Sequence, residues 1–145
     1  MADFDYYGNQ LDPNAFVART HKYILDISLT SLQLLTAQQI TLRGTEMYFA
    51  IMRLMAVASD TTGLASFRCA MYTSNSDRYQ AASLGGVSDR VIASCLFGTA
   101  SRPAVLPVPI VIPGTASLLL DLENLVASGN DLHLVLEGVR LFPKQ

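Results

Sequence analysis

Charged side chains are scarce in this 145-residue chain: Asp, Glu, Lys and Arg make up 15% of the residues, whereas an ordinary soluble domain has about 25%. Half of the residues are apolar, so the chain has too much buryable surface and too little charge to be disordered. The formal net charge of −2 excludes a strongly basic surface for nucleic acid or for an anionic membrane. We therefore expect a folded domain, part of whose surface contacts other protein molecules instead of solvent.

Long apolar runs and cysteines are scarce as well. The most apolar window, residues 47–58, contains Arg53 and falls short of the roughly 20 residues that a membrane span needs. The N-terminus, MADFDYYGNQ, is acidic and lacks the apolar stretch of a signal peptide, which predicts a protein that stays in the cytoplasm where it is made. Cys69 and Cys95 lie in alternating apolar segments, which favours two buried free thiols over a disulfide or a redox pair.

Catalytic and metal-binding motifs are missing: there is no Gly-rich phosphate loop, no Cys pair at metal spacing and no His-Glu-x-x-His. His21 and His133 are expected to be exposed or hydrogen-bonded rather than catalytic. Asp121 and Glu123 fit the solvated face of a strand better than a calcium or acid–base site. The sequence thus predicts a protein that is not an enzyme, with no catalytic residues, no cofactor and no metal, although a triad is recognised by geometry that a sequence does not show.

The chain does contain many short segments of period two. Residues 22–30 alternate between apolar and polar, as in a half-buried strand. Residues 47–57 are apolar on both faces apart from Arg53, which favours a central strand covered on each side, with a helix as the competing interpretation. About eight strands with frequent turn signals predict an all-β fold, an antiparallel β-sandwich of the jelly-roll type. The other expected strands are 40–42, 67–72, 91–97, 105–113, 117–122 and 132–141, the last with a bulge at Gly138.

Two segments fall outside this pattern. Residues 1–21 form an aromatic N-terminal arm that either docks across a neighbouring subunit or packs on its own domain, and residues 22–145 form a single β-sandwich domain. The long polar loop at residues 73–90 indicates contact more than chemistry. Prolines confine residues 105–113 to a sheet edge or to an extended run beside a sheet, since proline cannot donate to a β-ladder. The candidate interface residues are Phe4, Tyr6, Tyr7, Phe16, Tyr79, Pro107 and Pro109.

Several short motifs follow one another in the C-terminal half. They are FGTASRP at 97–103, LPVP at 106–109, IPGT at 112–115, Asn124-Leu125 and a closing LHLVLEGVRLF at 132–142. Over about residues 40–145 this order resembles small virion proteins of tailed bacteriophages. Those are β-sandwich or jelly-roll subunits in which a Gly…Arg-Pro…Pro stretch, a Pro-Gly-Ser/Thr turn and a final Leu-x-Leu-x-Gly-x-Arg strand recur. The arm has no counterpart in that pattern.

The resemblance implies a non-enzymatic bacteriophage structural protein that oligomerises and attaches to the capsid as a decoration, cement or vertex protein. Its expected partners are copies of itself and other virion proteins such as a major capsid protein, with neither nucleic acid nor membrane. Its expected location is the virion, after synthesis in the host cytoplasm. Two alternatives stay open: a neck or tail-hub component, and a carbohydrate-binding adhesive β-sandwich that uses Tyr72 and Tyr79. The absence of tryptophan, the strongest sugar-stacking residue, counts against the second.

Overall fold

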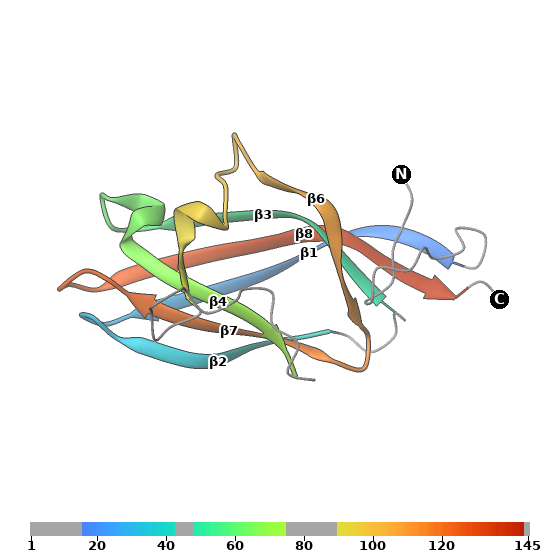
Figure 1. The fold of residues 1–145 in the computed structure, drawn as a ribbon, viewed down its shortest axis with the longest axis horizontal. Coiled ribbons are helices and arrows are strands. Elements are labelled where there is room, and N and C mark those ends of the chain that lie inside the picture. Colours follow the sequence, from blue (N-terminus) through green and yellow to red (C-terminus); the bar gives the residue numbers. More distant parts are fainter. Residues whose placement is uncertain (1–15, 43–47, 75–89, 144–145) are drawn as a thin grey trace, which may run out of the picture.

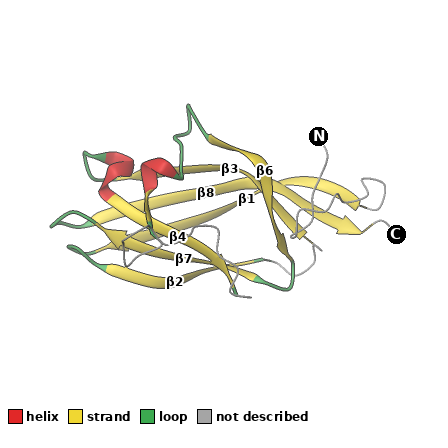
Figure 2. Cartoon of the chain, viewed as in Figure 1, coloured by secondary structure: helices red, strands yellow, loops and turns green. Residues whose placement is uncertain are grey.

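The computed structural model describes residues 16–42, 48–74 and 90–143 of the chain. Nearly all of this part is extended, and its helical elements are two single turns of 3-10 helix (Figure 2). In chain order the elements are β1 (Phe16–Leu29), β2 (Leu34–Thr41), β3 (Tyr48–Ala58), η1 (Gly63–Ser66), β4 (Phe67–Thr73), β5 (Val91–Ile92), η2 (Ala93–Cys95), β6 (Ala104–Pro113), β7 (Ser117–Asn124) and β8 (Asn130–Pro143).

The strands form two antiparallel sheets of four strands each, packed face to face (Figure 1). One sheet has the order β1-β8-β3-β6 and the other the order β2-β7-β4-β5. The chain crosses from one sheet to the other at every connection except that between β4 and β5. Eight strands in this order form a jelly roll. The predicted all-β sandwich is confirmed.

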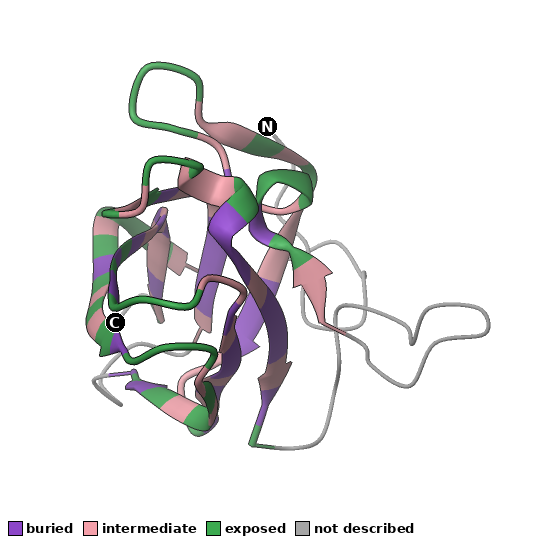
Figure 3. Ribbon diagram, turned by 90° about the vertical axis from the view of Figure 1, so that its left-hand side faces the viewer, coloured by how far each residue is buried: buried purple, intermediate pink, exposed green. Residues whose placement is uncertain are grey.

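The core lies between the two sheets and is filled by alternate residues of each strand, so that the inward faces are buried and the loops exposed (Figure 3). In β8 every second residue from Asn130 to Gly138 is buried. Each fully buried side chain of Leu, Ile or Phe size contributes about 1.5–3 kcal/mol of transfer free energy. The largest of them are Phe49, Phe67, Leu29, Ile51, Leu54, Met71, Ile112, Leu118, Leu120, Leu122, Leu134 and Leu136.

Residues 47–57 form a strand and not the competing helix, since residues 48–58 are β3. β3 pairs with β8 on one side and with β6 on the other, which makes it central as predicted. The expectation that both of its faces are covered is wrong. Leu54 on the inner face is completely buried, whereas Val57 on the outer face is 58% exposed.

The predicted arm ends earlier than residue 21, because residues 16–21 belong to β1. β1 pairs with β8 over its whole length, from Leu29 back to Phe16, without a register shift. Residues 17–20 are all exposed and show no alternation, so backbone pairing with β8 forms this part of the strand without help from a buried face. Residues 1–15 lie outside the described residues.

The predicted strand at residues 91–97 is also wrong beyond its first two residues. β5 ends at Ile92, and the chain then forms the helical turn η2. The amide groups of Leu96 and Phe97 donate to the carbonyl oxygen of Ala93 at 3.0 and 2.8 Å. Ala93 and Phe97 are thereby buried together, four residues apart. The apolar pattern of this segment is thus compatible with a helical turn as well as with a strand.

The two cysteines are free but differ in access. Cys69 faces the core from β4, where burial and then the negative charge of Asp121 raise the pKa of its thiol. Cys95 in η2 is exposed, so the prediction of two buried thiols is wrong for this one. We expect a thiol reagent such as DTNB to modify Cys95 in the native protein and Cys69 only in denaturant, because the reactive thiolate is disfavoured at a buried site.

Single substitutions separate the two thiols. Cys95→Ser should remove labelling of the native protein, and Cys69→Ser should leave it unchanged. Fast labelling of native Cys95→Ser would contradict the buried position of Cys69 in the core.

Gly138 lies where two strands approach closely, and not at a bulge in its own strand. The ladder between β3 and β8 shifts by one residue at Met52, opposite Gly138, while β8 stays in register with β1. A Cβ atom at Gly138 would lie 1.8 Å from the carbonyl oxygen of Ala50. The predicted bulge therefore lies in the neighbouring strand, and the glycine makes room for it.

β6 forms one edge of its sheet, as its prolines predicted. Its ladder with β3 is interrupted: residues 106–109, which include Pro107 and Pro109, all lie opposite Met52. Both prolines thus occupy positions where the ladder needs no N–H donor. β6 bends sharply along its length (Figure 1).

Candidate interaction surface

The outer face of β1, β8 and β3 carries apolar side chains that no part of the described chain covers fully. The register places Ile24 beside Val135 and Val135 beside Met55, which gives one row across three strands. We name these three residues the apolar row. Ile24 is 56% exposed, and Val57, in the next row, is 58% exposed. Isolated exposed apolar residues are ordinary, but a contiguous set on one sheet face indicates a contact surface.

A positively charged row lies on one side of the apolar row. It consists of Lys22, Glu137 and Arg53, which neighbour one another across the same three strands. Lys22 and Arg53 form ion pairs with Glu137 at 3.8 and 3.4 Å, and their side chains are 59% and 50% exposed. Such exposed pairs contribute at most about 1 kcal/mol to folding. The row keeps one surplus positive charge at the surface.

An acidic row lies on the other side of the apolar row. It consists of Asp26, His133 and Val57, in register across the strands. The imidazole Nδ1 of His133 contacts the carboxylate of Asp26, and both side chains are exposed. Asp131, two residues before His133, adds a second exposed carboxylate at this end of the face. His133 thus lies on the outer face of its strand, as predicted.

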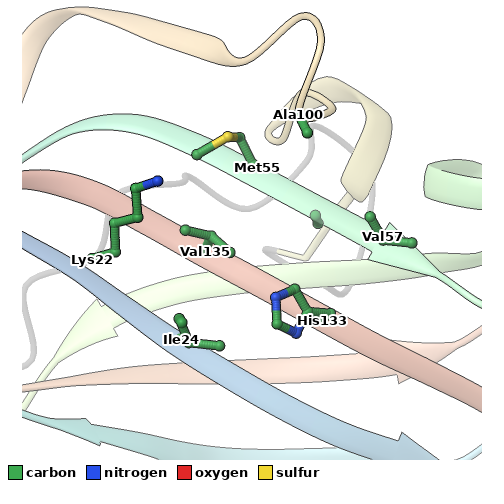
Figure 4. Close-up of a pocket in the computed structure, with 8 residues that line it drawn as sticks. Lys22, Ile24, Met55, Val57, Ala100, His133 and Val135 are labelled. Atoms are coloured by element: carbon green, nitrogen blue, oxygen red, sulfur yellow. The ribbon is translucent and has the colours of Figure 1, made fainter.

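A shallow hollow of about 320 Å³ opens over the apolar row (Figure 4). Its rim is completed by Ala100, which the chain brings to β3 through backbone pairing: Gly98 donates to Leu54 O at 3.0 Å and accepts from Ala56 N at 2.9 Å. A Cβ at Gly98 would lie 2.2 Å from Arg102 O, so only glycine fits where the chain turns back against Arg102. The hollow is lined by Lys22, Ile24, Met55, Ala56, Val57, Ala100, His133 and Val135.

The outer face of the other sheet is held together by a buried carboxylate. Asp121 was expected on a solvated face, but it is only 8% exposed. Its Oδ1 accepts hydrogen bonds from the hydroxyl of Tyr72 at 2.9 Å and from the amide of Ala37 at 2.8 Å. Ala37 has a φ of +54° within the irregular part of β2 between Leu35 and Gln38. Asp121 thus anchors an irregular strand, and the Tyr72 hydroxyl is engaged in the same network.

The other candidate chemical groups take structural positions. His21 is half-buried in β1, with its ring edge-on to Tyr23 at a centroid distance of 4.5 Å. Glu123 lies between Arg68 and Arg90 at 3.7 and 3.6 Å. Within residues 16–42, 48–74 and 90–143, no three His, Cys, Asp or Glu side chains cluster so as to hold a metal ion. Neither helical turn in these ranges has the length or apolarity to cross a membrane.

The predicted interface residues are placed only in part. Phe16 is half-buried, with its ring edge-on to Tyr48 at 5.9 Å. Pro107 is exposed and Pro109 half-buried, on β6. Phe16 lies on β1, the opposite edge strand of the same sheet, so the structure does not bring it together with the prolines. The remaining members, Phe4, Tyr6, Tyr7 and Tyr79, lie outside the described residues.

Sequence reasoning missed the apolar row itself. Residues 22–30 were interpreted as a strand with one polar face, yet Ile24 interrupts that face. Met55 and Val57 gave the same signal, because they make residues 47–57 apolar on both sides. Only the register between β1, β8 and β3 brings these residues into one surface.

No protein-family model matches the chain, and neither a curated protein nor a solved structure is significantly similar to it. The resemblance to virion proteins of tailed bacteriophages therefore stays a prediction from motif order.

Proposed function

We propose that this chain is a non-enzymatic structural subunit of a tailed-bacteriophage particle, which associates with copies of itself and attaches to the capsid. The observation that carries the proposal is the uncovered apolar row on the outer face of a jelly roll. A jelly roll that keeps apolar side chains on a sheet face is suited to packing against another protein surface.

Two further features support the proposal. Jelly rolls are common in viral capsid proteins, which is an argument by analogy between folds. The edge strand β6 carries Pro107 and Pro109 where its ladder is interrupted, which protects that edge from uncontrolled strand pairing. A subunit present in many copies needs this protection, because every copy presents the same edge. Repeated weak contacts between subunits then add up through the high effective concentration within an assembly.

Particles of the phage that encodes the chain provide the test. An antibody against the purified protein is used to follow it through density-gradient purification of the particles. We expect the chain to co-sediment with the particles in a fixed molar ratio to the major capsid protein, and immunogold labelling to decorate the heads.

A chain that stays at the top of the gradient, with no copy on the particles, would overturn the proposal. Label confined to the neck or tail would place the protein in the particle but overturn attachment to the capsid. As the matched control, a host cytoplasmic protein of similar size should stay at the top in the same gradient.

A further inference from the structure

We propose that the outer face of β1, β8 and β3 binds the same face of a second copy of this chain, related by a two-fold axis that crosses the strands at the apolar row. This step rests on the proposed function, in which the chain self-associates, and adds the surface and its geometry.

The charges on this face change sign along the strand direction. The row of Lys22, Glu137 and Arg53 lies two residues to one side of the apolar row and carries a net positive charge. The row of Asp26 and His133 lies two residues to the other side, and its one carboxylate, on Asp26, gives it a negative charge when histidine is counted as neutral. Two residues of a strand span roughly 7 Å. The face is therefore positive, apolar and negative in succession over roughly 13 Å.

This pattern is complementary to itself in one orientation. A two-fold axis that lies in the face and runs across the strands reverses their direction, so β1 of one copy lies over β1 of the other. Lys22 then faces Asp26 of the second copy, and Glu137 faces the imidazole of its His133. The apolar row meets itself on the axis. An axis parallel to the strands would instead place charges of the same sign over one another, which costs free energy at an interface.

The shape of the face agrees with an isologous contact, in which the same patch serves both copies. β1 extends five residues beyond Ile24 to its end at Leu29, so the overlap about this axis covers about eleven residues, roughly 36 Å. β3 ends three residues beyond Met55, at Ala58, and so overlaps over about seven residues. The three strands together give roughly 460 Å² per copy, below the roughly 800 Å² of a standard stable interface. An interface of this size is typical of a weak, reversible contact, which a larger assembly can reinforce by repetition.

Charge reversal at the two facing positions tests this geometry. Sedimentation velocity over a range of concentrations measures the dissociation constant. Lys22→Asp places two carboxylates opposite each other at both symmetric contacts, and Asp26→Lys places two ammonium groups there. We expect each variant alone to associate at least about tenfold more weakly than wild type. An equimolar mixture of the two variants restores opposite charges at both contacts, and we expect it to form a heterodimer about as strong as the wild-type dimer.

The mixture makes the test independent of folding, because a misfolded variant cannot be rescued by its counterpart. Thr41→Asp is the matched control, since Thr41 is exposed on β2 in the other sheet, and it should leave the dissociation constant unchanged. If the wild type self-associates and neither charge reversal weakens the association, the proposed face is wrong, although the chain does bind copies of itself. If the wild type stays monomeric at about 0.5 mM, the proposal that a second copy binds this face is wrong. Co-sedimentation with particles is measured separately, so the attachment to the particle stated in the proposed function stands or falls independently of these outcomes, whereas a monomeric chain would also contradict its self-association.

Discussion

Replacing Gly138 by alanine is expected to destabilise the folded state by at least about 4 kcal/mol, a large part of the 5–15 kcal/mol that holds a typical domain folded. The added Cβ would lie 1.8 Å from the carbonyl oxygen of Ala50 and 2.8 Å from its carbonyl carbon. These are backbone atoms of the central strand β3, which is paired on both sides. The clash cannot be relieved by a side-chain rotation, so a strand must move.

Urea denaturation followed by far-UV circular dichroism measures this effect, since the chain has no tryptophan to report unfolding. Gly129→Ala is the matched control: its nearest neighbour would be Leu29 O at 3.8 Å, an ordinary contact. We expect the control to shift the unfolding free energy by less than about 1 kcal/mol. Equal midpoints for the two variants would show that β3 does not approach Gly138 as closely as described.

The strands were predictable wherever one face of a segment is buried and the other solvated. Tyr23 and Leu29 are buried where the alternation of residues 22–30 places them. Pro107 and Pro109 similarly predicted a sheet edge, because a missing donor is a local property that holds in any fold. These signals depend only on the residue and its near neighbours.

Features that depend on partners far away in the chain could not be predicted from the sequence. Residues 16–21 form a strand because β8 pairs with them, although their own side chains carry no alternation. Residues 93–95 form the helical turn η2, after which the ring of Phe97 lies against that of Phe67 from another part of the chain. The apolar row arises from the register between three strands far apart in the chain. Ile24 and Val135 are each unremarkable alone and become a surface only when β1 and β8 pair.

A network of hydrogen bonds made by buried asparagine side chains closes one end of the sandwich. The sequence did not predict this network either. Asn124 at the end of β7 is 1% exposed, and its Nδ2 donates to Thr30 O at 2.8 Å and to Ser128 O at 2.9 Å. It thus ties the turn after β1 to the connection between β7 and β8. Each such buried polar group must be paired, since an unpaired one costs about 1–3 kcal/mol.

Asn130→Ala is expected to lower the unfolding free energy by about 3 kcal/mol. The Asn130 side chain donates to Ser66 Oγ at 2.9 Å and to Asn124 Oδ1 at 3.3 Å. It also accepts from the amide of Asp60 at 3.2 Å. The hydroxyl of Ser59 donates to the same oxygen at 3.5 Å. Alanine removes all four bonds at a position that is 1% exposed, so the partners lose their bonds where water has little access. The midpoint of urea denaturation measures the loss.

Asp131→Ala, one residue further along β8, is the matched control for that loss. Asp131 is exposed, and its hydrogen bonds to Ser59 use its backbone amide and carbonyl, which alanine keeps. We expect this variant to unfold within about 0.5 kcal/mol of wild type. If Asn130→Ala were equally mild, packing and the remaining hydrogen bonds of Asn124 and Asp131 would suffice to close this end. The larger loss expected for Asn130→Ala would instead show that the closure depends on the hydrogen bonds of the Asn130 amide group.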